Sequence, residues 1–275
     1  MYISTQLRYR NFKLSAIITA VIAILILLLS FYVGKDELFL LFNMNLGATG
    51  DFFFKYGTNA GDGLLWIVWL IAILLTKRKH LLTLIISAFI LSTLFTQVGK
   101  LLILPDEFRP AESIKLSTLK LQEKDDLKLI NGVPVVTFTD MYSQINTFKK
   151  GDIVEVVYWR NNKMDTSKVE VQKNINLHLV KGVDVHSYGS FPSGHTGTAF
   201  TFALLIALLI PSATVSITCI LIALIIGYSR IYLSQHYPVD VAAGMIVAVF
   251  SVTLAVLFQN YIDRKRRRKT NSEIN

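Results

Sequence analysis

The sequence has little charge and almost no cysteine for its length of 275 residues. Its single cysteine, Cys219, excludes a disulfide within the chain and a cysteine-based metal site. Charged residues make up 17% of the chain, whereas a typical soluble domain has about 25%. Hydrophobic residues make up 52%, and the mean hydropathy is +0.48. This balance favours a polytopic membrane protein over a soluble globular one.

Six apolar segments approach or exceed the roughly 18–20 residues that a helix needs to cross a bilayer. We expect these spans at residues 13–33, 60–76, 81–103, 195–210, 213–230 and 239–259. The second and fourth are short, and a polar end on each is expected to extend its helix. The first is followed by no small-residue cleavage site and is interpreted as an uncleaved signal anchor. The predicted fold class is an all-α polytopic membrane protein with six transmembrane helices.

The formal net charge of +9 comes from basic clusters beside the apolar spans, which argues against nucleic-acid binding. The clusters in residues 1–13, 77–79 and 264–269 hold 12 of the 28 basic residues, whereas segment 105–194 has 12 basic and 12 acidic residues. The positive-inside rule predicts that all three clusters, and both termini, are cytoplasmic. The long segment 104–194 would then face the periplasm of a bacterial inner membrane.

Segment 104–194 is too long for a structureless loop and has a pattern of its own. A short helix is expected at 139–148, followed by a strand at 153–159. Residues 117–173 resemble the C-terminal half of a PDZ domain, in the stretch LINGVPVVTFTDMYSQINTFKKGDIVEVVYWRNNK. The resemblance implies a small α+β insert between the third and fourth spans. The peptide-carboxylate loop of the family is not evident upstream.

Polar residues occur where the apolar spans end, and the predicted topology brings them to one level. They are Lys100, Arg109, Ser193, Gly194, His195, Arg230, His236 and Asp240. Lys100 is about 20 residues into the third span, which is about 30 Å of helix and reaches the outer side. Charged residues are costly within a bilayer, so a shared level at its outer boundary indicates a functional site.

The composition of this cluster is typical of a phosphate site. Arg109 and Arg230 offer planar guanidinium groups to phosphate oxygens, and Lys100 offers a point charge. Ser193 and Gly194 precede a helix, whose free N–H groups can point at an anion.

Two histidines and one carboxylate complete the predicted chemistry. A neutral His236 can attack phosphorus while Asp240, four residues later, accepts its other ring N–H and holds its tautomer. His195 can protonate the leaving oxygen as a general acid, and water then hydrolyses the phosphohistidine. The sequence has no carboxylate cluster suited to Mg²⁺ or Zn²⁺, so we expect catalysis without a metal or other cofactor.

Two motifs resemble the second and third signatures of the type 2 phosphatidic acid phosphatase (PAP2) superfamily. PSGH ends at His195, and SRIYLSQHYPVD matches Ser-Arg, five residues, His, three residues and Asp. The resemblance covers about residues 60–255, interrupted by the insert, and implies a six-helix membrane bundle. It also implies that His236 is the nucleophile, Asp240 its orienting partner and His195 the acid. The other five polar residues would form the phosphate cradle.

One departure from the family concerns its first motif. The family has six residues between a lysine and Arg-Pro, whereas eight separate Lys100 from Arg109-Pro110. Either two residues around Pro105 are looped out, or Lys100 does not fill this role and Arg109 acts alone.

The predicted organisation has four parts. They are the N-terminal half of the membrane domain (1–110), the PDZ-like insert (111–180), the C-terminal half of the membrane domain (181–262) and a basic cytoplasmic tail (263–275).

The predicted function is hydrolysis of a lipid phosphate or diphosphate at the periplasmic face, with undecaprenyl pyrophosphate as the first candidate. Lipid A phosphate, phosphatidylglycerol phosphate and phosphatidate stay open as substrates. A PAP2-type lipid phosphotransferase is the alternative enzyme, and a non-catalytic scaffold that binds a protein partner through the insert is a third hypothesis.

Overall fold

The computed structural model describes residues 2–62, 67, 71, 74–75 and 81–274. The second predicted span, 60–76, therefore lies mostly outside the described residues.

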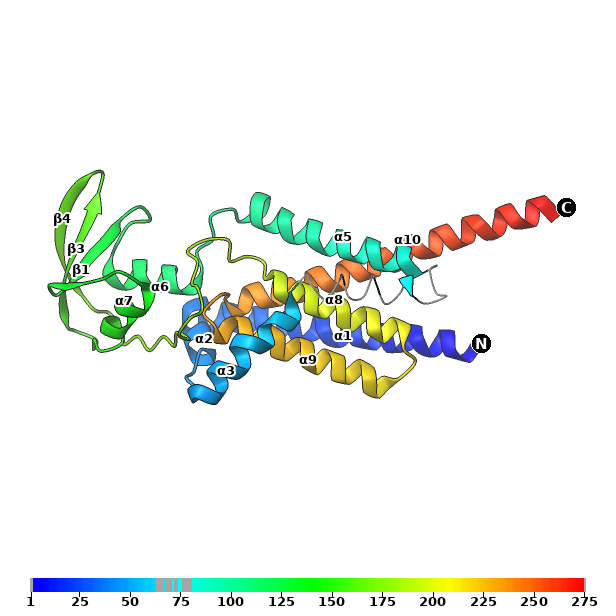
Figure 1. Ribbon diagram of the computed structural model, residues 1–275, viewed down its shortest axis with the longest axis horizontal. Coiled ribbons are helices and arrows are strands. Elements are labelled where there is room, and N and C mark those ends of the chain that lie inside the picture. Colours follow the sequence, from blue (N-terminus) through cyan, green and yellow to red (C-terminus); the bar gives the residue numbers. More distant parts are fainter. Residues whose placement is uncertain (1, 63–66, 68–70, 72–73, 76–80, 275) are drawn as a thin grey trace.

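Long apolar helices form most of the molecule (Figure 1). They are α1 (Tyr2–Val33), α5 (Leu82–Val98), α8 (Gly194–Leu209), α9 (Ala213–Tyr232) and α10 (Pro238–Ile274). Among the described residues, four helical stretches are long and apolar enough to cross a membrane: Tyr9–Val33, Leu82–Ile103, Ala213–Tyr232 and Pro238–Arg266. They coincide with the first, third, fifth and sixth predicted spans, and α8, at the fourth, is a shorter apolar helix. The chain is a multi-pass membrane protein.

The helix α10 packs against α1, α5 and α8 and forms the centre of the bundle. Its contact with α8 depends on Gly244, where an added Cβ would lie only 2.6 Å from the carbonyl oxygen of Ser193. The Ser193 N–H also donates to the carbonyl of Asp240 at 3.0 Å. The start of α8 is thereby held against the start of α10.

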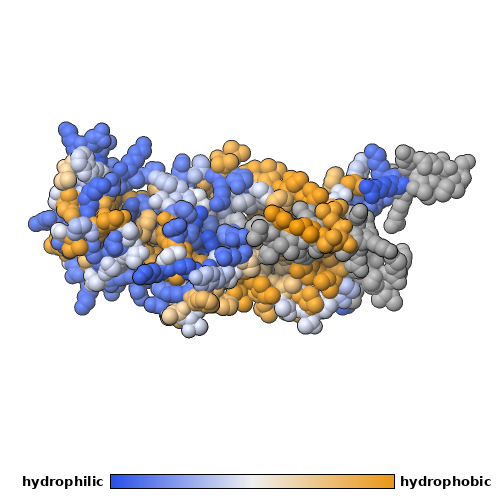
Figure 2. All heavy atoms as spheres, in the orientation of Figure 1, coloured by the Kyte–Doolittle hydropathy of each residue, from blue (hydrophilic) through white to orange (hydrophobic). Residues whose placement is uncertain are grey.

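Apolar side chains cover the outer surface of the bundle. Figure 2 shows a hydrophobic zone over the helices, whereas hydrophilic residues predominate at the other end of the molecule. Leu28 on α1 and Leu257 on α10 are 60% and 59% exposed. Extensive exposed apolar surface of this kind marks the part of the molecule that faces lipid.

The insert is a small antiparallel sheet with helices at its side. Its elements are α6 (Pro110–Leu119), β1 (Asp126–Ile130), β2 (Val133–Pro134), α7 (Phe138–Ile145), β3 (Ile153–Arg160) and β4 (Lys163–Glu170). The strand order is β2-β1-β3-β4. The helix α7 starts and ends earlier than the expected 139–148, because Thr137 and Asp140 form a reciprocal capping box. The likeness to a PDZ domain stays a prediction.

Three short helical elements follow α1 and pack against α9: α2 (Lys35–Phe42), α3 (Gly47–Gly57) and η1 (Thr58–Gly61). The start of α2 forms two ion pairs: Lys35 with Glu107, which precedes the insert, at 2.7 Å, and Glu37 with Lys173 of the insert at 2.8 Å. In Figure 1 the sheet and the two termini lie at opposite ends of the molecule.

Candidate active site

The turn that carries His236 follows directly from the way α9 ends. Ser234 donates its N–H to the carbonyl of Ile231 at 3.0 Å, and Gln235 donates to that of Arg230 at 2.9 Å. This pair of bonds is a Schellman motif, and Ser234 has the left-handed backbone it requires, with φ of 57°. Residues 233–237, named the His236 turn below, thus place a 2% exposed His236 next to Arg230.

Asp240 lies in the first turn of α10, but it does not form the predicted hydrogen bond to His236. Its Oδ2 atom is 3.6 Å from His236 Nδ1. The same oxygen accepts from Ser190 Oγ at 2.5 Å and from the N–H of Tyr237 at 2.9 Å. His236 Nδ1 is buried and has no hydrogen-bond partner among the described residues. The imidazole and the carboxylate are thus neighbours without a hydrogen bond between them, since Asp240 Oδ2 accepts from Ser190 and Tyr237 instead.

The electrostatic surroundings of His236 favour its neutral form. Burial lowers the pKa of this imidazole well below its ordinary value, and the positive charges of Arg230, Arg109 and Lys100 lower it further. A neutral imidazole at pH 7 has a free nitrogen lone pair, which a nucleophile requires.

Arg230 is 8% exposed and has an unused donor. Its Nη1 atom donates to Thr58 Oγ1 at 2.7 Å, which fixes the guanidinium against η1. Its Nε atom is buried without a hydrogen-bond partner in the described part of the chain. Leaving a charged donor unpaired is costly, so a phosphate oxygen would be a favourable partner at this position.

Lys100 and Arg109 lie close together in spite of the eight residues between them. Lys100 is within a π-helical turn, η3 (Gly99–Ile103), where Leu104 donates its N–H to the carbonyl of Gly99 at 3.0 Å. A π turn takes in an extra residue, and the chain then bends before Arg109. Lys100 Nζ donates to the Gly189 carbonyl and Arg109 Nε to the Tyr188 carbonyl, each at 3.0 Å. Both cations therefore contact one short segment next to PSGH.

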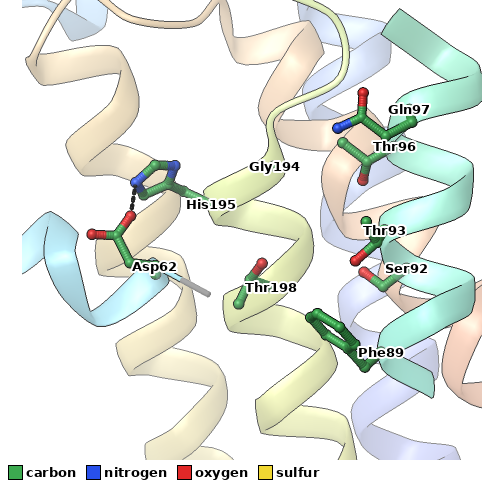
Figure 3. Close-up of a pocket in the computed structure, with 10 residues that line it drawn as sticks. Asp62, Phe89, Ser92, Thr93, Thr96, Gln97, Gly194, His195 and Thr198 are labelled. Carbon is green, nitrogen blue, oxygen red and sulfur yellow. Dashed lines mark ion pairs between the residues drawn. The ribbon is translucent and has the colours of Figure 1, made fainter. Parts of the chain in front are cut away.

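His195 is paired with a carboxylate that the sequence did not indicate. Its Nε2 atom is 2.6 Å from Oδ1 of Asp62, the residue after η1. Figure 3 shows the two side chains facing each other from α8 and from the end of η1. They line a pocket of about 200 Å³ together with Gly61, Phe89, Ser92, Thr93, Thr96, Gln97, Gly194 and Thr198. The pocket places His195 beside a polar cavity between α8 and α5.

The two remaining predicted residues begin α8. Ser193 is fully buried, and its hydroxyl accepts from Thr196 Oγ1 at 2.9 Å rather than capping the helix. Gly194 is the first residue of the helix. The eight predicted residues thus come together where η1, the PSGH segment and the His236 turn meet.

Four residues of this region were not predicted: Thr58, Asp62, Ser190 and Gln235. Gln235 accepts a short hydrogen bond from Arg109 Nη1 and donates to the carbonyl of Asp184 at 2.8 Å. No motif or periodicity distinguishes these residues in the sequence, because their contacts come from segments far apart in the chain. The described residues contain no group of three or more His, Cys, Asp or Glu side chains that could hold a metal ion.

The comparisons with known proteins give short but concordant matches. Undecaprenyl-diphosphatase BcrC of Bacillus subtilis is 36% identical over 77 residues, which are 28% of this chain and 37% of that protein. The lipid A 1-phosphatase of Rhizobium johnstonii is 40% identical over 74 residues, 26% of this chain and 29% of that protein. The lipid A 4'-phosphatase of Bacteroides thetaiotaomicron is 35% identical over 74 residues, 27% and 32% of the two chains. The matched part spans 29% to 37% of the length of these relatives.

The fold is similar to that of a solved structure, Aquifex aeolicus LpxE. The TM-score is 0.51 at 21% sequence identity, and the match covers 80% of this chain and 93% of that chain. Residues 138–264, which include both motifs around His195 and His236, match the model of the PAP2 superfamily. Over residues 138–264, the chain is thus similar to the PAP2 superfamily.

Proposed function

We propose that this protein is a membrane phosphatase that removes phosphate from a lipid phosphate or diphosphate. The observation that carries the proposal is a buried His236 close to the positive charges of Lys100, Arg109 and Arg230, which favour its neutral form. Phosphoryl transfer needs a positioned nucleophile and positive charge around the phosphoryl oxygens, and this arrangement supplies both.

The proposed reaction has two steps. In the first, His236 Nε2 attacks phosphorus, the bond to the leaving oxygen breaks, and His195 gives that oxygen its proton. In the second, His195 takes a proton from water, the water oxygen attacks phosphorus, and the bond to His236 breaks. Asp240 would accept the Nδ1–H of His236 throughout and keep the attacking nitrogen unprotonated.

The proposed cradle for the phosphoryl oxygens consists of Lys100, Arg109 and Arg230 with Ser193 and Gly194. The unpaired Nε of Arg230 and the free N–H groups at the start of α8 are donors that a phosphate oxygen can use. The π turn at Gly99 supports the assignment of Lys100 to this cradle, because it brings the ammonium group beside Arg109.

A lipid substrate fits the surroundings of this site. An apolar pocket of about 190 Å³ lies between α8 and α9, with Ala60 of η1 at its wall. It is further lined by Ala199, Phe202, Ala203, Ile206, Cys219, Ile222, Ala223 and Ile226. Because η1 also holds Arg230, the pocket can take part of a lipid chain near the phosphate cradle. The names of the relatives support undecaprenyl diphosphate as the first candidate and lipid A as the alternative.

The proposed arrangement in the membrane has six transmembrane helices, with the second within 60–76 and α8 as the fourth. The insert, 111–180, would divide the halves at 1–110 and 181–262, and the basic tail 263–275 would be cytoplasmic. The opposite positions of sheet and termini support a periplasmic active site (Figure 1). A protein partner for the insert stays a prediction.

Phosphate release from a panel of lipid phosphates and diphosphates tests the proposal. The full chain in detergent should release phosphate from at least one of them, also in the presence of EDTA. His236→Ala should lose all measurable activity, while His80→Ala, beside the predicted cytoplasmic cluster, should keep it. Activity of His236→Ala close to that of the wild type would refute the mechanism, provided both variants elute as single species.

A further inference from the structure

The His236 turn is held from outside the site by Asn43, a buried side chain at the end of α2. We propose that Asn43 and Ser234 are positioning residues, which fix the His236 turn and with it the direction of the attacking imidazole. The inference rests on the proposed role of His236 and adds a set of contacts that no motif contains.

Asn43 completes the end of α9. Its Nδ2 atom lies 3.1 Å from the carbonyl of Ile231, 2.9 Å from that of Tyr232 and 3.1 Å from Ser234 Oγ. The last carbonyls of a helix lack partners within it. The Ile231 carbonyl also accepts from the N–H of Ser234, whereas for the Tyr232 carbonyl the Asn43 amide is the partner that the described structure shows. The side chain is 1% exposed, which excludes water as an easy replacement.

The orientation of the Asn43 amide is fixed by a backbone group. Its Oδ1 atom accepts from the N–H of His178 at 2.7 Å. Because a backbone N–H can only donate, oxygen must be on this side, and the NH₂ group must face the His236 turn.

The hydrogen bonds of the Ser234 hydroxyl explain why this position has a serine, although glycine adopts a left-handed backbone more easily. Its left-handed φ of 57° is unfavourable for a residue with a Cβ. Its hydroxyl, however, accepts from Asn43 and donates to the carbonyl of His178 at 2.9 Å. Asn43, Ser234 and His178 thus form a closed ring of hydrogen bonds in which each residue holds the other two.

A second contact ties the same segments together. His178 Nε2 is 2.8 Å from Oδ1 of Asp51, and this oxygen also accepts from Tyr232 OH at 2.6 Å. The segment that contains His178, the helix α3 and the end of α9 are therefore joined through Asp51.

The location of these contacts predicts which kinetic constant changes. The Arg230 guanidinium is anchored independently by Thr58, so loss of the ring should leave phosphate binding largely intact. Attack by His236 instead needs alignment within a fraction of an ångström, and a misplacement of about 1 Å can cost about 100-fold in rate. We therefore expect Asn43→Ala to lower kcat by roughly 10- to 100-fold, with little change in KM.

The experiment compares three variants of the full chain in detergent, with a lipid substrate that the wild type hydrolyses. Asn43→Ala removes all the hydrogen bonds of the Asn43 side chain, both to the end of α9 and to His178. Ser234→Gly removes only the hydroxyl, since glycine adopts the left-handed backbone without strain. Asn45→Ala is the matched control, because Asn45 is exposed and, among the described residues, its side chain accepts from the N–H of Gly47 alone. We would measure kcat, KM, inhibition by vanadate as a phosphate analogue, and the thermal midpoint.

The expected result is a lower kcat in Asn43→Ala and a smaller loss in Ser234→Gly, with KM and vanadate inhibition unchanged and Asn45→Ala like the wild type. A normal kcat in folded Asn43→Ala, with only the thermal midpoint lowered, would overturn the inference. If Asn43→Ala does not fold, a normal kcat in Ser234→Gly overturns it. A wild type without activity, or an active His236→Ala, would instead refute the proposed function itself.

Discussion

His195 and His236 lie in different electrostatic surroundings. His195 has the carboxylate of Asp62 at 2.6 Å, which stabilises its protonated form. His236 has positive charges around it and no bonded carboxylate in the described structure. Burial and the charges of Arg230 and Arg109 act on both imidazoles, so the Asp62 carboxylate is what distinguishes His195, in keeping with its proposed role as the acid.

The pairing with Asp62 predicts a loss that depends on the leaving group. Asp62→Asn should lower kcat for a lipid phosphate monoester by about 10- to 100-fold, toward the lower end of what general acid–base catalysis contributes. An alkoxide must be protonated as it leaves, so this substrate needs the acid most. A lipid diphosphate has a much less basic leaving oxygen and should lose less. The measurement is kcat for both substrates at pH 7.

Asp106→Asn serves as the matched control, because Asp106 is an exposed carboxylate on the segment before Arg109. It should leave both activities unchanged. Equal losses of Asp62→Asn on the two substrates would show that Asp62 does not act through the acid.

The chemical roles of the individual residues could be predicted from the sequence better than their contacts could. Arg, Lys and His types at fixed spacing indicated a phosphate site, because few other ligands need that combination. Asp62 and Asn43 could not be predicted, since each acts on a residue more than a hundred positions away. The expected bond between Asp240 and His236 is not formed, because Ser190 takes the same carboxylate oxygen.

The π turn at Gly99–Ile103 is the irregular element that follows α5. It occurs where α5 meets the PSGH segment. An added Cβ on Gly99 would lie 2.5 Å from Cδ of Pro192. Glycine therefore permits the close approach that brings Lys100 and the start of α8 into one cradle.

Gly99→Ala should disturb the cradle while leaving the nucleophile in place. The new methyl group cannot fit beside the rigid proline ring, so the PSGH segment must shift. Such overpacking typically costs about 1–3 kcal/mol, and we expect a lower thermal midpoint together with a KM raised by roughly 10-fold, on the order that this energy allows. Thermal unfolding and steady-state kinetics in detergent measure both effects.

Gly57→Ala provides the comparison for this change. Gly57 is exposed, has a helical φ of −64°, and would have no atom within 4 Å of an added Cβ. It should behave like the wild type. A Gly99→Ala protein with unchanged KM and stability would show that the close approach is not required.

At the scale of elements, length and hydropathy were sufficient for the long helices. The stretches Tyr9–Val33 and Ala213–Tyr232 lie where apolar runs predicted them. The π turn left no such trace, because one extra residue in a turn does not alter hydropathy. Its only sequence signal was the eight-residue spacing between Lys100 and Arg109, which allowed two readings.

At the scale of the whole molecule, the site depends on segments that the insert separates. Arg109 precedes the sheet of the insert and His178 follows it, yet Arg109 contacts the His236 turn through Gln235, and His178 contacts it through Asn43. The ion pair of Glu37 with Lys173 holds the insert close enough for this. The predicted membrane topology placed the polar clusters together at the outer boundary of the membrane. It could not predict that residues 34–59 pack against α9, because that contact results from packing in three dimensions.

The single cysteine makes the orientation of the molecule testable. In a Cys219→Ser background, each introduced cysteine is the only thiol. Lys163→Cys places it in the exposed first position of β4, and Lys265→Cys places it near the end of α10, also exposed. The strand β4 and the C-terminal end of α10 lie at opposite ends of the molecule (Figure 1). With the active site at the periplasmic face, a membrane-impermeant maleimide should label Lys163→Cys in intact spheroplasts and Lys265→Cys only after lysis.

The reverse pattern would place the site in the cytoplasm, and labelling of both in intact cells would mean that the bundle does not separate the two ends. Because α10 joins the His236 turn to the basic tail, the position of Lys265 decides the side on which His236 meets its lipid.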